Sequence, residues 1–460
     1  MTGAPIEALS LRLARFVVQT PEAGIPSSAL RSAARVVLDA SGVMRAASAL
    51  APEVQPFIAH AVEGGAGPAS ILGTAHGVRP ALAALANGAM AHALDYEDAL
   101  DGAPLHPNAS LVPAVLALAQ AKGQVPGRTL LAAIAVGCEV SCRIALGLRQ
   151  RLEDGGWYPP PILGAFGAVA GAARLLGLTP QQLLDAWSLL LLQNSTPGEI
   201  KHDRDTVIRA VREAFPAQVA VQATQLAQSG VRGFEAPLEG RDGFFRLFAG
   251  NRYDAEALFA GLGERWHIES LSFKPWPSCR GTHAAIECAL LLRSRVDWRA
   301  IRELHIEGCE VHRMLALPSE RKAAPQTAID ARFSLPYTVA TALVTGSVNL
   351  DSFGAEALAS TQVLQLAQRA RFVQREDWGV DRAASGALQI LDAGGRILRH
   401  EVLDPRGSPA RPLEEAELIA KFVDCAGRAR VPVAAQPAAV LARRILDMES
   451  APDAGALIAG

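Results

Sequence analysis

The sequence is poor in aromatic residues, which make up 5% of its 460 residues, whereas hydrophobic residues make up half of them. The interior must therefore be built mainly from Ala, Leu and Val, and such a composition favours closely packed helices over a sheet sandwich. The formal net charge is only −2, and no acidic or basic block is long enough to form a charged tail. This charge balance argues against a nucleic-acid partner.

Metal-ligand spacing is also missing among the cysteines. Cys138 and Cys142 lie four residues apart on an apolar helical stretch, where buried thiols are commoner than metal ligands. The other cysteines are scattered at Cys279, Cys288, Cys309 and Cys425. We therefore expect reduced cysteines and no bound metal.

Long apolar runs are absent as well. The longest, residues 130–138 and 183–192, are too short to cross a bilayer. The first residues lack a basic stretch followed by an apolar one, so we expect no secretory signal and a cytoplasmic protein that does not bind membranes. Lysine is scarce too, which makes each of its positions of interest: Lys122, Lys201, Lys274, Lys322 and Lys421.

The length of the chain predicts two domains. A helical pattern runs from Pro5 to about Leu258, and Thr179-Pro-Gln-Gln predicts a capped helix start. Beyond residue 265, segments 301–311 and 386–402 alternate with period two, which predicts strands, and the second segment reads as a hairpin. Segments 333–344 and 353–368 read as helices between them.

The fold class we predict is mainly α with an α+β part. A large all-helical domain of residues 1–268 and 409–460 would hold both termini, and a smaller α+β lid domain would comprise residues 269–408.

Four carboxylates and two histidines are concentrated in residues 91–110, between two apolar helical runs. The spacing of His92, Asp95 and Asp98 predicts that they share one helix face. Gly102 and Pro104 then break the helix and let His106 return toward it, with Ser110 as the expected cap of the next helix. A carboxylate beside an imidazole can transfer protons. The alternative is a capped helix end with a solvated acidic loop.

A second group of polar residues lies in the segment 272–292. Prolines hold residues 274–277 extended, and Gly281-Thr282 opens a predicted helix over 283–292. Lys274, Arg280 and His283 would then surround a helix N-terminus, where backbone N–H groups attract anions, as in a carboxylate-binding site. The alternative is a loop whose cations make ordinary surface ion pairs.

Several motifs then occur in order along the chain: His92-Ala-Leu-Asp-Tyr-Glu-Asp98 with a following Leu105-His-Pro, Gly137-Cys-Glu-Val-Ser-Cys-Arg143, Gly164-Ala-Phe-Gly167, Lys274-Pro-Trp-Pro-Ser-Cys-Arg-Gly-Thr-His283 and Arg332-Phe-Ser-Leu-Pro-Tyr337. This series, over roughly residues 10 to 425, resembles the MmgE/PrpD family. That family includes 2-methylcitrate dehydratase, cis-aconitate decarboxylase and iminodisuccinate epimerase. The resemblance implies a homodimer and a cofactor-free active site between a helical domain and a lid domain.

By motif, the resemblance places Asp95, His106, Lys274 and Tyr337 on active-site positions, with Arg280 and His283 in the same signature as Lys274. For Tyr337 the alternative is a core tyrosine whose hydroxyl is satisfied.

The sequence also departs from the family pattern. Tyr158 stands where an active-site histidine is expected, and Arg212 and Phe215 stand where many of the lyases have lysine and histidine. A phenol is a weak base and a good proton donor, so we expect Tyr158 to deliver a proton.

The expected chemistry is proton transfer α to a carboxylate. We expect His106, held by Asp95, to act as the base. Lys274, Arg280 and Arg212 would stabilise the carbanion. The leading prediction is a cofactor-independent lyase, a dehydratase or decarboxylase, acting on a small di- or tricarboxylate. The alternatives are an epimerase of an amino- or imino-dicarboxylate and a catalytically degenerate family member that binds a carboxylate.

Overall fold

The computed structural model describes residues 8–203 and 206–459. Residues 1–7, in which we expected no signal segment, lie outside the described part. The chain divides into a helical unit, residues 8–93, 103–271 and 414–459, and an α+β unit, residues 94–102 and 272–413. The fold is mainly α with an α+β part, as predicted.

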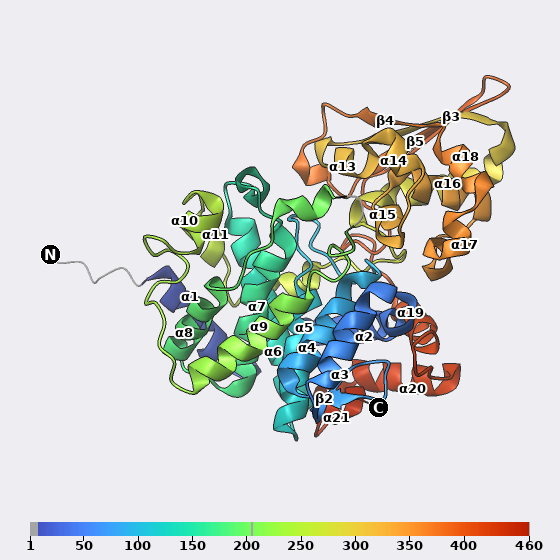
Figure 1. Ribbon diagram of the computed structural model, residues 1–460. Coiled ribbons are helices and arrows are strands. Elements are labelled where there is room, and N and C mark those ends of the chain that lie inside the picture. The colour runs from blue at the N-terminus through green and yellow to red at the C-terminus, as the bar shows by residue number, and fades with distance from the viewer. Residues whose placement is uncertain (1–7, 204–205, 460) are drawn as a thin grey trace. The chain divides into compact units, whose positions relative to one another are not determined.

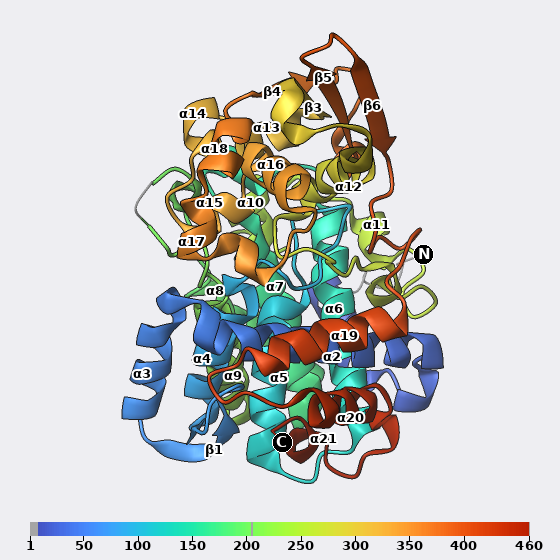
Figure 2. The same cartoon turned by 90° about the vertical axis from the view of Figure 1, so that its right-hand side faces the viewer.

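The helical unit contains the following α-helices: α1 (Leu9–Gln19), α2 (Ser27–Leu50), α3 (Gln55–Glu63), α4 (Pro80–Ala93), α5 (Asn108–Lys122), α6 (Gly127–Gly147), α7 (Pro159–Leu176), α8 (Pro180–Leu191), α9 (Ala214–Gln228), α10 (Phe244–Ala249), α11 (Ala255–Phe259), α19 (Glu415–Gly427), α20 (Ala435–Leu446) and α21 (Ala454–Ala459). Helices α4 to α7 and α9 form its centre (Figure 1), and α19, the first helix of segment 414–459, packs against α2 (Figure 2). The capping box predicted at Thr179 is present at the start of α8.

Small residues explain how the central helices pack so closely. A Cβ atom added to Gly137 of α6 would lie 2.6 Å from the carbonyl oxygen of Gly167 in α7. Real Cβ atoms do not approach so near, so this crossing requires glycine. The scarcity of aromatic residues and the abundance of Ala and Gly thus correspond to short distances between helix backbones.

Helix α6 is longer than the apolar run seen in the sequence. By length and composition alone its 21 residues could cross a membrane, but 94% of its most apolar window is buried inside the protein. Such burial is typical of the core helix of a protein, so this one apolar helix is weak evidence for a membrane span. A short antiparallel pair that we did not predict, β1 (Ala66–Ser70) and β2 (Gly77–Val78), interrupts the helices.

The α+β unit has a four-stranded sheet in the order β4-β3-β5-β6, formed by β3 (Ile301–Gly308), β4 (Ala370–Gln374), β5 (Gly386–Asp392) and β6 (Ile397–Val402). The predicted hairpin is the antiparallel pair β5–β6, whereas β4, which runs parallel to β3, was not predicted. Its α-helices are α12 (His283–Leu292), α13 (Arg313–Ala316), α14 (Ser319–Ala323), α15 (Ala328–Arg332), α16 (Leu335–Thr345), α17 (Ala355–Leu358) and α18 (Thr361–Ala367).

Three local predictions were wrong. Helix α4 ends at Ala93, and Asp95 has a left-handed backbone with φ of 48°, so the acidic residues do not share a helix face. Helix α5 begins at Asn108, after Pro107, and Ser110 lies inside its first turn instead of capping it. Segment 353–368 is not one helix, because it breaks between α17 and α18 at Ser360.

Candidate active site

The ends of four packed helices carry the candidate residues of the helical unit. His92 lies in the last turn of α4, His106 lies two residues before α5, Tyr158 is the N-cap residue of α7, and Arg212 lies two residues before α9. Helices α4, α5, α7 and α9 pack against one another (Figure 1). Three of these ends are N-termini, which carry partial positive charge and attract anions.

Gly164 shows how closely the starts of α5, α7 and α9 approach. A Cβ atom added there would lie 3.1 Å from Ser110 Oγ, 3.8 Å from the His106 carbonyl oxygen and 4.0 Å from Glu213 Oε2. Ser110 is fully buried, and its hydroxyl has no hydrogen-bond partner among the described residues. A buried hydroxyl without a partner is costly. A polar ligand at this point would relieve that cost.

The hydroxyl of Tyr158 is held by two guanidinium groups. It accepts hydrogen bonds from Arg212 Nη1 at 2.6 Å and from Arg209 Nε at 3.4 Å. Tyr158 is 5% exposed, and its own proton has no acceptor within residues 8–203 and 206–459. Because guanidinium groups only donate, that proton is available to a ligand.

Three cations also surround the Tyr158 ring. Arg212 Cζ lies 5.1 Å from the ring centroid, and both Arg209 Cζ and Lys201 Nζ lie 5.7 Å from it. Each lies within the range of a cation–π interaction. Arg209 and Lys201 were not among the predicted site residues, and no motif in the sequence marks them. Only the scarcity of lysine drew attention to position 201.

Two imidazole rings complete what we call the helix-end cluster, namely His92, His106, Tyr158, Arg209 and Arg212. The rings of His92 and His106 lie 5.4 Å apart at a tilt of 52°. His92 is buried, whereas His106 is partly exposed. The ends of these packed helices thus carry proton carriers and cations, the groups that proton transfer on a carboxylate substrate requires.

In the α+β unit, Lys274 binds the acidic segment 94–102. Its ammonium group donates to the Asp95 carbonyl oxygen at 3.0 Å and to the Asp95 carboxylate, and Glu97 Oε2 lies 4.0 Å away. Burial alone would lower the pKa of Lys274, but the charges of Asp95 and Glu97 raise it overall. Lys274 is therefore a protonated cation, suited to stabilising negative charge and unsuited to acting as a base.

Arg280 and His283 make contacts within their own unit. Arg280 forms a bidentate salt bridge to Asp101, with distances of 2.9 and 3.0 Å, and donates to the Arg406 carbonyl at 3.1 Å. His283 is buried, with Nε2 3.1 Å from the Ser278 carbonyl oxygen. These contacts order the loop, and the assignment of both residues to substrate binding stays a prediction.

Tyr337 lies in the core of the α+β unit. It is fully buried in α16, and its hydroxyl donates to the Ser352 carbonyl oxygen at 2.8 Å. Burial raises the pKa of Tyr337 to about 12. These surroundings match the alternative given in the sequence analysis, a core tyrosine whose hydroxyl is satisfied.

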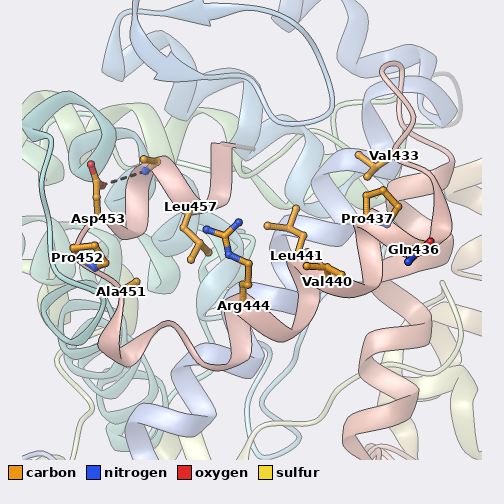
Figure 3. A pocket seen from close by; sticks show the side chains of 11 residues that line it. Val433, Gln436, Pro437, Val440, Leu441, Arg444, Ala451, Pro452, Asp453 and Leu457 are labelled. Carbon is orange, nitrogen blue, oxygen red and sulfur yellow. Dashed lines mark hydrogen bonds between the residues drawn. The ribbon is translucent and has the colours of Figure 1, made fainter.

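A separate pocket of about 740 Å³ lies at the C-terminal helices of the helical unit (Figure 3). Leu441, Arg444 and Leu457 line it, and Asp453 at its edge is hydrogen-bonded to the Ala456 backbone. No histidine, tyrosine or lysine is among its lining residues in the described part of the chain. We assign it no catalytic role.

Comparisons with known proteins agree with the motifs. The MmgE/PrpD N-terminal domain matches residues 11–256, and the MmgE/PrpD C-terminal domain matches residues 276–445. The chain belongs to the MmgE/PrpD family, which confirms the resemblance.

Among curated proteins, the chain is 26% identical to the cis-aconitate decarboxylase-like protein oryM of Aspergillus oryzae over 91% of each chain. It is 26% identical to cis-aconitate decarboxylase of Aspergillus terreus over 78% of this chain and 77% of that protein. It is 27% identical to cis-aconitate decarboxylase of Mus musculus over 65% and 62% of the two chains. These relatives support a lyase of the MmgE/PrpD family.

Proposed function

We propose that the protein is a cofactor-independent decarboxylase that releases CO₂ from a small unsaturated tricarboxylate of the cis-aconitate type. The observation that carries the proposal is the Tyr158 hydroxyl, which is held by Arg212 and Arg209 with its proton uncommitted among the described residues. The decarboxylase relatives support the same reaction class.

The reaction needs a cation field and a proton donor. When the C–C bond to the leaving carboxylate breaks, CO₂ departs and the electron pair remains on the substrate. The double bond delocalises that pair toward a remaining carboxylate, where Arg212 stabilises it. A proton from Tyr158 or His106 then forms the new C–H bond.

We also propose roles for residues of the α+β unit. Lys274 would supply positive charge, and Asp95 would fix the position of its ammonium group. Arg280 would keep this segment ordered through Asp101. The homodimer and the cytoplasmic location stay expectations from the sequence.

The test is decarboxylation in D₂O by the purified protein supplied with cis-aconitate. The wild type should release CO₂ and place one deuteron in the product. Tyr158→Phe should lower turnover by about 10²- to 10⁴-fold, the usual contribution of one acid–base group. Tyr253→Phe is the matched control, because Tyr253 belongs to no proposed site and stacks on Phe245, with 4.0 Å between the ring centroids.

Other outcomes would contradict the proposal. Deuterium entering recovered substrate without CO₂ release would indicate an epimerase, and water addition or loss would indicate a dehydratase. Binding of tricarboxylates without any turnover would indicate a degenerate member of the family. A Tyr158→Phe variant with nearly full activity would remove Tyr158 as the proton donor.

A further inference from the structure

The surroundings of Lys201 favour the binding of an anion. Lys201 ends the 3₁₀ helix η4 (Gly198–Lys201) and is half-buried. Its ammonium group has no ion pair with any described residue. Burial lowers the pKa of Lys201, Glu153 opposes this effect, and Arg209 and Arg151 lower the pKa further. An incoming carboxylate would offset these unfavourable effects.

Arg209 is the second cation at this place, with its Cζ 5.7 Å from the centroid of the Tyr158 ring. Lys201 Nζ lies 5.7 Å from the centroid of the Tyr158 ring, on whose hydroxyl Arg209 and Arg212 converge. Arg209 is 8% exposed and Lys201 is half-buried, so water screens neither cation fully. An ammonium group and a guanidinium group both recognise carboxylate oxygens.

The chemistry of decarboxylation decides which carboxylate this should be. A carboxylate that leaves as CO₂ loses its charge, so strong cation binding would stabilise the ground state and slow the reaction. Cations therefore help when they hold a carboxylate that stays on the product. Lys201 adds a positive charge of this kind near Arg209, and it takes no part in the 3.1 Å ion pair between Arg212 and Glu213.

We propose that Lys201 and Arg209, which lie beside the Tyr158 ring, form the subsite for a carboxylate that is retained in the product, which makes the protein select tricarboxylates over dicarboxylates. This inference rests on the proposed function for its substrate class. It adds two specificity-determining residues, Lys201 and Arg209, to the site.

The test is binding of two unreactive anions, measured by calorimetry on the full chain. Propane-1,2,3-tricarboxylate carries the central carboxylate, and glutarate has the same carbon chain without it. Lys201→Met should weaken binding of the tricarboxylate about tenfold, the low end for a charged hydrogen bond, and leave glutarate binding unchanged. Lys201→Arg should restore most of the preference because it keeps the charge.

Lys122→Met is the matched control. It removes another lysine of the helical unit, whose ammonium donates to the Leu175 carbonyl at 3.1 Å, and should leave both affinities unchanged. Lys201→Gln provides a second variant if Lys201→Met does not fold. Equal losses for both anions, no loss for either, or a wild type that does not prefer the tricarboxylate would overturn the subsite.

The binding readout separates this inference from the proposed reaction. If the wild type releases no CO₂ but Lys201→Met abolishes the preference, the subsite holds and the proposed reaction fails. If CO₂ is released and the preference does not depend on Lys201, the reaction holds and the subsite fails.

Discussion

Replacing Lys274 by methionine would remove the cation that binds the acidic segment 94–102 within the α+β unit. Lys274 and Asp95 are fully buried, and Glu97 is 1% exposed. The variant would leave the Asp95 carboxylate buried without its ammonium partner. Breaking a buried pair by removing one partner costs about 3–5 kcal/mol, and we expect the α+β unit to lose that much stability.

The assay must report on that unit, since a chain with two units need not unfold in one step. Hydrogen exchange of backbone amides in residues 94–102 and 272–278 gives the local free energy of opening. Lys421→Met is the matched control, because it breaks a buried ion pair to Asp39 in the helical unit, at 2.6 Å, and should not change exchange in these segments.

A second variant tests the cause. Lys274→Met combined with Asp95→Asn removes the unpaired charge and should recover more than half of the lost free energy. If Lys274→Met alone costs less than about 1 kcal/mol, a typical value for an exposed pair, the buried ion pair does not hold the segment.

The pH dependence follows from the raised pKa of Lys274. The stability that the pair contributes is fully present below the unfolded lysine pKa of about 10.4 and is lost only as pH rises through the higher folded pKa. Hydrogen exchange of the 94–102 segment, corrected for its intrinsic rate, should therefore show no change from Lys274 titration between pH 6 and 9.

Two more outcomes follow from the packing. Gly164→Ala places a Cβ atom 3.1 Å from Ser110 Oγ, so we expect the helix starts to shift and turnover to fall about tenfold. Gly427→Ala is the control, because its Cβ atom meets nothing closer than 3.9 Å and should leave turnover unchanged. Burial lowers the pKa of His312 to about 4. The neutral imidazole therefore contributes its full stability above pH 6.5, and the free energy of unfolding should fall by about 3 kcal/mol as pH falls from 6.5 to 4. Denaturant titrations of wild type and His312→Gln across that range check this, and equal pH dependence in both proteins would contradict it.

Local signals were sufficient for several elements. Helix α12 begins and ends at the predicted residues, because Gly281-Thr282 precedes a mostly apolar run. The β5–β6 hairpin followed from alternation around a glycine turn. Each of these signals lies within a few residues of the element it specifies.

Elements that depend on distant partners were not predicted. Strand β4 is short, and its pairing with β3 joins residues more than sixty positions apart. Asp95 adopts its left-handed backbone where Lys274, 179 positions later, binds both its carbonyl and its carboxylate. Helical spacing between His92 and Asp98 carries no information about that lysine.

The candidate site divides in the same way. Motifs identified His106, Tyr158 and Arg212, but neither Arg209 nor Lys201, whose relation to the Tyr158 ring exists only after the chain folds. Likewise, the sequence left two environments open for Tyr337, and the contact with Ser352 shows the buried one.

The amino-acid sequence by itself determined the family, the helical and α+β composition, and the residue types available for proton transfer, because these follow from local periodicity and from motifs. Tertiary structure alone decided which cations surround Tyr158 and which carboxylate pairs with Lys274. Those relations depend on distances between segments far apart in the chain, and electrostatic interactions in a protein interior depend on such distances and on burial.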